Sequence, residues 1–262
     1  MQRAAADNGM ILPERGGDME EIQQLKEWVK ESENIVFFGG AGVSTESNIP
    51  DFRGVDGLYR KQYKYPPETI ISHSFYVKNT AEFYRFYRSK MLFPDAKPNK
   101  AHLALAKLEA IGKLKAVITQ NIDGLHQEAG SRKVLELHGS VKRNYCSRCG
   151  KFYGLEEMLK AIGPDEIPTC SCGGIIKPDV VLYEESLDQT VLSQAVPYID
   201  RADMLIVGGT SLTVYPAAGL IDYYKGNKLV LINKTVTPMD GKADLAISDS
   251  LGKVLDEAVC EL

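Results

Sequence analysis

The chain has 262 residues, of which 44% are hydrophobic and 25% charged, so it can bury the core of a large α/β domain with a smaller module, or of two ordinary domains. Its net charge of −4 gives no overall basic footprint for nucleic acid. No apolar run approaches the roughly 18 residues that a membrane span needs, and the N-terminus lacks the apolar segment of a secretory signal. We therefore expect a cytoplasmic protein with no membrane or nucleic-acid partner. The oligomeric state stays open, with a monomer favoured.

Short apolar segments alternate with amphipathic ones along most of the chain. Residues 1–18 are polar and aperiodic, and we expect a disordered leader there. The alternation predicts a Rossmann-like parallel sheet with helices on both faces, and Asn99 and Gly112 are expected to cap one of these helices. The predicted helices are 19–32, 80–91, 99–112, 188–200, 215–225 and 249–262, and the predicted strands are 35–38, 116–119, 134–137, 203–209 and 228–233.

The segment 140–180 breaks this rhythm and holds four of the five cysteines. Cys146-x-x-Cys149 and Cys170-x-Cys172 form two close pairs, and four thiolates complete a tetrahedron around Zn²⁺ with no open position. A structural zinc ion is therefore predicted, with four free thiols as the minor alternative.

The cysteine-rich segment also suggests how the chain divides. We expect a zinc-binding module at 140–180 and a Rossmann-like domain formed by 19–139 and 181–262, with a helical insertion at about 55–98.

A glycine-rich loop follows the first predicted strand. In IVFFGGAGVSTES, Gly39, Gly40 and Gly42 stand at the strand end, where small residues let the backbone approach a phosphate closely. The third glycine of the usual dinucleotide fingerprint is replaced by Thr45. Taken alone, a tight turn without a ligand is about as plausible as a cofactor site.

Three separated motifs resemble the sirtuin family of NAD-dependent protein deacylases: GAGVSTESNIPDFRG (40–54), TQNIDGLH (119–126) and LHGS (137–140). The four cysteines and GTSLTVYPA (209–217) follow in the same order, and the likeness runs from about 19 to 255. Asn48 stands where sirtuins commonly have Gly, and Asn tolerates unusual backbone angles better than most residues. Tyr183-Glu184-Glu185 stands where a typical member has Phe-Gly-Glu, which alters the substrate groove.

The resemblance implies an enzyme that consumes NAD to remove acetyl, or another acyl group, from lysine side chains of proteins or peptides. Nicotinamide leaves, the amide oxygen of the acyl-lysine attacks C1′ of the ribose, and O-acyl-ADP-ribose is released. Sirtuins that prefer acidic acyl groups carry Tyr and Arg three positions apart. No Tyr of EFYRFYRSK (82–90) has Arg at that spacing, so acetyl or another neutral acyl group is favoured.

The resemblance also assigns site residues. His138 is the expected general base on a ribose hydroxyl, a task that suits imidazole because it titrates near neutral pH. Asn121 is the second expected catalytic residue, while Val181 and Tyr183 are expected to bind the substrate peptide. The expected cofactor-binding residues are Ala41, Thr45, Phe52, Arg53, Gln120, Ile122, Asp123, Gly209, Thr210, Ser211 and Asn233.

Other functions fit parts of the sequence. An NAD-dependent ADP-ribosyltransferase would use the same scaffold and is the main alternative. A dehydrogenase would normally show the complete fingerprint GxGxxG. A zinc ribbon that binds nucleic acid or protein is the alternative from a different class, and the short segment and acidic chain argue against it.

Overall fold

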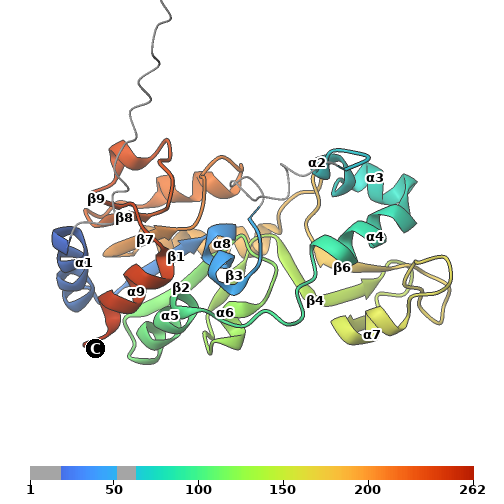
Figure 1. The fold of residues 1–262 in the computed structure, drawn as a ribbon, viewed down its shortest axis with the longest axis horizontal. Coiled ribbons are helices and arrows are strands. Elements are labelled where there is room, and N and C mark those ends of the chain that lie inside the picture. The colour runs from blue at the N-terminus through green and yellow to red at the C-terminus, as the bar shows by residue number, and fades with distance from the viewer. Residues whose placement is uncertain (1–18, 52–62) are drawn as a thin grey trace, which may run out of the picture.

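The larger part of the molecule is built on one parallel β-sheet, which lies to the left in Figure 1. The computed structural model describes residues 19–51 and 63–262. The six strands follow the order β3-β2-β1-β7-β8-β9, and every neighbouring pair is parallel. The strands are β1 (Ile35–Gly39), β2 (Leu114–Thr119), β3 (Val134–Glu136), β7 (Met204–Gly208), β8 (Leu229–Ile232) and β9 (Leu245–Ile247). The predicted Rossmann-like sheet is confirmed.

The strand order reverses beside β1. The chain builds outward from β1 through β2 and β3, and then returns to β7 on the other side of β1. In open α/β sheets, ligands bind outside the carboxyl ends of the strands at such a reversal. Strands β1 and β7 pair as far as Gly39 and Gly208. The loops that follow these two glycines therefore mark the expected ligand site.

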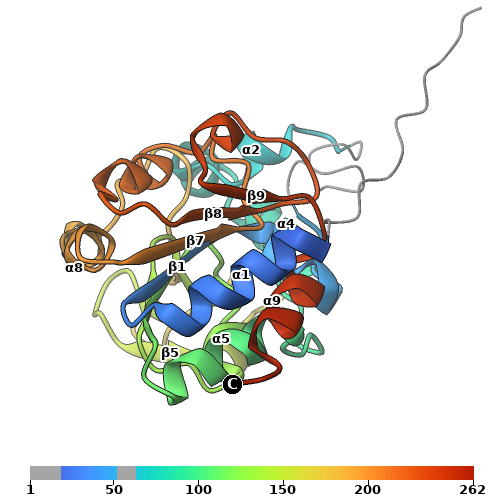
Figure 2. The same cartoon turned by 90° about the vertical axis from the view of Figure 1, so that its left-hand side faces the viewer.

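Helices cover both faces of the sheet, as expected for strands that are apolar throughout. All five residues of β1 and of β7 are buried. Figure 2 shows α1, α5 and α9 on one side of the strands, and α8 packs with the 3₁₀ helix η4 on the other. Their bounds are α1 (Met19–Glu31), α5 (Lys100–Ala110), α8 (Gln189–Asp200), η4 (Ala217–Tyr223) and α9 (Leu251–Val259).

The predicted N-cap of α5 is confirmed, whereas its C-cap is Ile111, one residue before the predicted Gly112. The Asn99 side chain accepts a hydrogen bond of 2.9 Å from the backbone N–H of Ala101. Gly112, just past the helix, has φ of +81°, a conformation in which glycine carries no steric cost. The helical segment predicted at 215–225 is a 3₁₀ helix. Strand β9 has three residues, too few for a periodic signal, and was not predicted.

The smaller part of the molecule, to the right in Figure 1, contains a three-stranded antiparallel sheet of order β5-β4-β6. The buried side chains of these strands share one apolar cluster with those of α2, α3 and α4. Tyr84 of α4 also donates a hydrogen bond of 2.6 Å to the carbonyl of Ile176 in β6. The elements are α2 (Pro67–Ile70), α3 (His73–Lys78), α4 (Thr80–Lys90), β4 (Gly139–Cys146), β5 (Phe152–Gly154), α7 (Leu155–Lys160) and β6 (Ile176–Val180).

The division of the chain into domains stays a prediction, as do the leader and the insertion boundaries. The described helices of the 55–98 segment, α2 to α4, pack with the strands of the cysteine-rich module. Across the described ranges, none of the helices is both long and apolar enough to cross a membrane.

Candidate functional site

A cavity of about 1370 Å³ runs along the carboxyl edge of the parallel sheet and reaches the smaller part of the molecule. Its volume exceeds the roughly 300–1,000 Å³ of common small-molecule sites. Every predicted site residue that the structure describes, apart from the four cysteines, lines this cavity. They are Ala41, Thr45, Gln120, Asn121, Ile122, Asp123, His138, Val181, Tyr183, Gly209, Thr210, Ser211 and Asn233. Phe52 and Arg53 lie outside the described residues.

The glycines after β1 allow two loops to touch. The backbone N–H of Gly42 donates a hydrogen bond of 2.8 Å to the carbonyl of Gly209, in the loop after β7. A Cβ atom on Gly42 would lie 2.7 Å from the Cα of Gly209, closer than real Cβ contacts. Asn48, at the end of the same loop, has φ of +62°. Asn therefore occupies the left-handed conformation for which Gly was expected, and the turn is kept.

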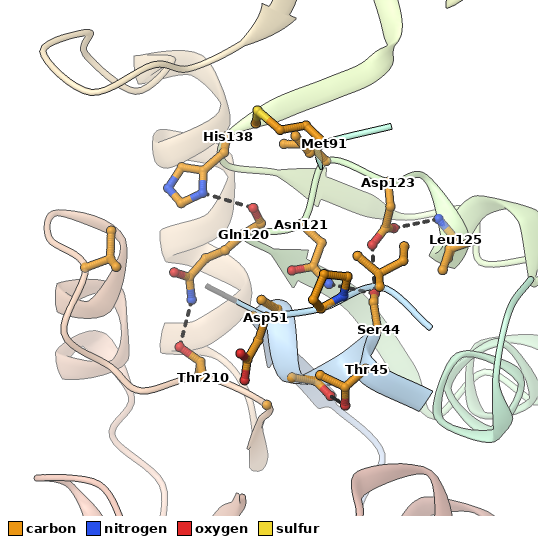
Figure 3. Close-up of a pocket in the computed structure, with 18 of the residues that line it drawn as sticks. Ser44, Thr45, Asp51, Met91, Gln120, Asn121, Asp123, Leu125, His138 and Thr210 are labelled. Atoms are coloured by element: carbon orange, nitrogen blue, oxygen red, sulfur yellow. Dashed lines mark hydrogen bonds between the residues drawn. The ribbon is translucent and has the colours of Figure 1, made fainter. Parts of the chain in front are cut away.

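Asp123 and Asn121 are held by a serine from the loop after β1. The Ser44 hydroxyl donates a hydrogen bond of 2.7 Å to Asp123 and accepts one of 3.0 Å from the Asn121 amide. The other Asp123 oxygen accepts a bond of 2.9 Å from the backbone N–H of Leu125. Figure 3 shows these groups together in the cavity. Ser44 was not among the site residues predicted from the sequence. Its only signal was a hydroxyl inside the GAGVS motif, beside Thr45.

His138 follows β3 and lines the cavity close to the end of β2. Its Nδ1 lies 2.9 Å from the backbone carbonyl of Gln120. Figure 3 marks this hydrogen bond with a dashed line. A carbonyl only accepts hydrogen bonds, so Nδ1 carries the proton and Nε2 of the neutral ring is the acceptor. Burial lowers the pKa of His138, and the bond to Gln120 opposes this effect without cancelling it. The imidazole is thus available as a proton acceptor at neutral pH.

Hydrogen bonds of Thr210 connect the loops that follow β2, β7 and β8. The Gln120 amide donates to the Thr210 hydroxyl over 3.1 Å, and the Thr210 backbone N–H donates to Asn233 Oδ1 over 2.9 Å. The Asn233 Nδ2 atom is buried and finds no hydrogen-bond partner among the described residues. A buried donor without a partner is costly. This donor therefore fits a ligand hydroxyl or carbonyl at the β8 end of the cavity.

Val181 and Tyr183 lie in the segment after β6, and both line the cavity. The Val181 N–H donates to the carbonyl of His138 over 3.0 Å, which fixes this segment beside the histidine. The Tyr183 N–H donates to Ile71, and its carbonyl accepts from His73, both over 3.0 Å. The backbone of Tyr183 is thus already paired, and the residue as a whole is 37% exposed. Its role in binding a peptide stays a prediction.

The four predicted metal ligands come together in the smaller part of the molecule. All four Sγ atoms of Cys146, Cys149, Cys170 and Cys172 lie within 4.8 Å of one another. The pairs Cys146–Cys172 and Cys149–Cys170 are 3.4 and 3.7 Å apart. A tetrahedron with Zn–S bonds of 2.3 Å has sulfurs about 3.8 Å apart. The cluster therefore fits one zinc ion, and four thiolates leave no position for catalysis.

Comparisons with known proteins agree with this geometry. The description "Sir2 family" matches residues 40–216, more than half of the chain. The chain belongs to the Sir2 family. This family member is 61% identical over 244 residues to the NAD-dependent protein deacetylase of Clostridium acetobutylicum, covering 92% of this chain and 99% of the relative. It is 54% identical to the enzyme of that name from Cutibacterium acnes, covering 89% of this chain and 95% of the relative.

Solved structures of Sir2 proteins show the same fold as this Sir2 family member. One holds a deacetylated p53 peptide and 3′-O-acetyl-ADP-ribose; its TM-score is 0.84 at 41% identity, covering 92% of this chain and 98% of that chain. Another holds a p53 peptide and NAD⁺, with a TM-score of 0.82 at 41% identity and the same coverage. The resemblance and the fold class expected from the sequence are both confirmed.

Proposed function

We propose that this chain is an NAD-dependent deacylase that removes acetyl, or another neutral acyl group, from lysine side chains of proteins. The observation that carries the proposal is that His138, Asn121 and Asp123 line one cavity with the loops after β1, β7 and β8. Support comes from relatives named NAD-dependent protein deacetylase and from a Sir2 structure with a propionylated peptide.

His138 acts as the general base in this proposal. Its Nδ1 proton is held by the Gln120 carbonyl at 2.9 Å, so Nε2 is the atom that takes a proton from a ribose hydroxyl. Because the pKa of His138 is lowered, Nε2 carries no proton at neutral pH. Proton removal makes that hydroxyl the nucleophile that later receives the acyl group. The histidine sits at a strand end, and such rigid support favours a fixed geometry.

Asp123 and Asn121 bind the nicotinamide half of NAD in this proposal. Ser44 occupies one lone pair of an Asp123 oxygen, and carboxylate oxygens have further lone pairs for a carboxamide N–H. Asn121 lies 9% exposed between Ser44 and the cavity, where its amide oxygen is suited to orient a ribose or a water. Both side chains are fixed in advance, which lowers the entropy lost when the reactants are aligned.

The loops after β1, β7 and β8 bind the ADP half. The small residues Gly40, Ala41 and Gly209 in these loops allow close approach of a diphosphate. The unpartnered Nδ2 of Asn233 supplies a donor for the adenosine ribose. When bound, NAD supplies the activated C1′ and the nicotinamide leaving group. Ser211 and Thr45 add hydroxyls to the same wall.

An acyl-lysine peptide binds along Val181 and Tyr183, beside His138. A cytoplasmic location remains an expectation, in keeping with thiolates that bind metal rather than form disulfides.

The proposal is tested by incubating the purified protein with NAD and an acetyl-lysine peptide. Nicotinamide, deacetylated peptide and O-acetyl-ADP-ribose should appear in equal amounts. The same peptide with unmodified lysine is the control, and it should release no nicotinamide. ADP-ribose attached to a protein, with nicotinamide released in the absence of any acyl group, would instead support the ADP-ribosyltransferase.

A further inference from the structure

The wall of the peptide groove carries an acidic side chain at a strained position. Glu184 follows Tyr183 and has φ of +75°, in the left-handed region. A residue with a Cβ atom is disfavoured there, and glycine is not. Glycine is also the residue that a typical sirtuin has at this point. The chain therefore keeps a side chain where the backbone favours none, and strained residues of this kind gather at functional sites.

The Glu184 carboxylate is held in a defined place. One oxygen accepts a hydrogen bond of 2.9 Å from the backbone N–H of Ser74, and the other accepts one of 3.0 Å from the Ser74 hydroxyl. Both Glu184 and Tyr183 line the cavity, and Glu184 is exposed. Each oxygen retains a free lone-pair site, so the carboxylate can accept further bonds from a ligand.

The charge of Glu184 is not neutralised within the described part of the chain. The carboxylate of its neighbour Glu185 lies 3.2 Å from the Lys177 ammonium and 2.8 Å from the His73 ring. Burial acts to raise the pKa of Glu185, but the Leu182 N–H and these two contacts together lower it. Glu184 has no such ion pair there. The cavity is also lined by the uncharged residues Val214, Tyr215 and Pro216. Of the two neighbouring acidic side chains, Glu184 is thus the one without an ion pair to a described residue.

The distance between Glu184 and Val181 along the chain determines which side chains of a bound peptide can contact Glu184. Val181 is hydrogen-bonded to the backbone of His138, and Glu184 lies three residues further along. Three residues span at most about 10 Å of extended chain. A peptide in the groove rises about 3.3 Å per residue. With the acyl-lysine beside Val181, as proposed, ~10 Å corresponds to about three residues of the peptide, so long side chains one or two positions from the acyl-lysine come within reach of Glu184.

We infer that Glu184 makes this enzyme prefer acyl-lysine substrates that carry Lys or Arg within two positions of the modified lysine. The inference rests on the proposed deacylase function and adds the charge of the substrate to it. Exposed ion pairs are weak, so the preference is about two- to fivefold in affinity and in kcat/KM. It decreases as salt is added, because exposed charges are screened.

The test uses acetyl-lysine peptides with a single Arg, Gln or Glu at each of the two positions on either side. Wild type, Glu184→Gln and Glu184→Lys are compared, with Glu156→Gln on α7 as the control for a lost acidic side chain outside the cavity. Wild type and the control should favour Arg over Gln at one or more positions. Glu184→Gln should bind the Arg and Gln peptides equally well. Glu184→Lys should bind the Glu peptide best. An unchanged Arg-to-Gln ratio in both Glu184 variants overturns the inference.

Two measurements separate this inference from the proposed function. Peptide affinity is measured by fluorescence anisotropy, which needs no turnover, and nicotinamide release is measured in parallel. Absence of turnover for every peptide overturns the deacylase, while the affinity ratios still decide the role of Glu184. A variant that is partly unfolded gives a lower signal with every peptide. The ratio of the signals for two peptides is therefore unaffected by a general loss of folded protein.

Discussion

The imidazole rings of His102 and His126 meet edge to face, with ring centroids 4.7 Å apart. Both side chains are almost completely buried. Neither ring nitrogen of His126 has a hydrogen-bond partner among the described residues. Burial, followed by the nearby His102, lowers the pKa of His126 to about 3. The charged form of this pair is therefore incompatible with the folded core.

Acid should destabilise the protein through His126. The folded state keeps the ring neutral, while the unfolded chain binds a proton below the ordinary pKa of 6.5. The neutral His126 ring therefore does not reduce the free energy of unfolding above pH 6.5, and the free energy of unfolding decreases as the pH falls below that value. Between pH 7.5 and 5.5 one such histidine lowers the free energy of unfolding by about 1.4 kcal/mol. Urea unfolding at both pH values should show that His126→Phe loses less stability than wild type by this amount. Equal losses would contradict the buried neutral ring.

Activity should extend to lower pH than an ordinary histidine allows. Burial lowers the pKa of His138, and the base form is the unprotonated ring. As pH rises, kcat/KM for the acetyl-lysine peptide should therefore increase through an apparent pKa below 6.5. The pH–rate profile measured by nicotinamide release checks this. An ascending limb centred above 6.5 would show that another group is the base.

Removal of the imidazole should abolish most of the turnover. His138→Ala is expected to lower kcat by about 10²- to 10⁴-fold, the usual contribution of a general base. Because the ring's hydrogen bond within the described part of the chain goes to the Gln120 backbone alone, the fold should survive. Steady-state kinetics are combined with circular dichroism to separate the two effects. Turnover equal to wild type would exclude His138 as the base.

Ser44→Ala should weaken the use of NAD. The change removes the donor to Asp123 and the acceptor of the Asn121 amide. Hydrogen bonds to charged groups contribute about 1.5–3 kcal/mol, so kcat/KM for NAD should fall about 10- to 100-fold. Ser193→Ala is the matched control, because among the described residues its hydroxyl donates a hydrogen bond to the Thr190 carbonyl alone, within α8. Similar kinetics for the two variants would mean that Ser44 does not position Asp123.

The cysteine cluster should hold one zinc ion per chain. Elemental analysis should give a ratio of one, and Cys146→Ser should lose metal, thermal stability and activity together. Cys146 also belongs to the apolar cluster that joins β4–β6 to α2–α4, so metal loss should loosen this whole part of the molecule. Cys260→Ser, remote in sequence and exposed, should retain all three properties. Full activity in zinc-free protein would show that the ion is dispensable.

Short sequence patterns predicted those features that depend only on residues near one another in the chain. Cysteine spacing allows two tight pairs, and the four sulfurs are close in the structure. Asn99 and Gly112 act within one turn of their own helix. The packing of α2–α4 against the zinc-binding strands was not predicted, because apolar periodicity shows which face is buried and not what covers it.

The amino-acid sequence by itself determined the alternation of strands and helices, the metal ligands and the motifs at the strand ends. These follow from side-chain period and from short-range spacing. Only the tertiary structure decided which groups meet. Ser44 and Asp123 are 79 residues apart in sequence, yet they are joined by a hydrogen bond of 2.7 Å. That contact exists because the carboxyl ends of parallel strands are brought to one edge of the sheet, a consequence of the whole chain's path and not of any segment.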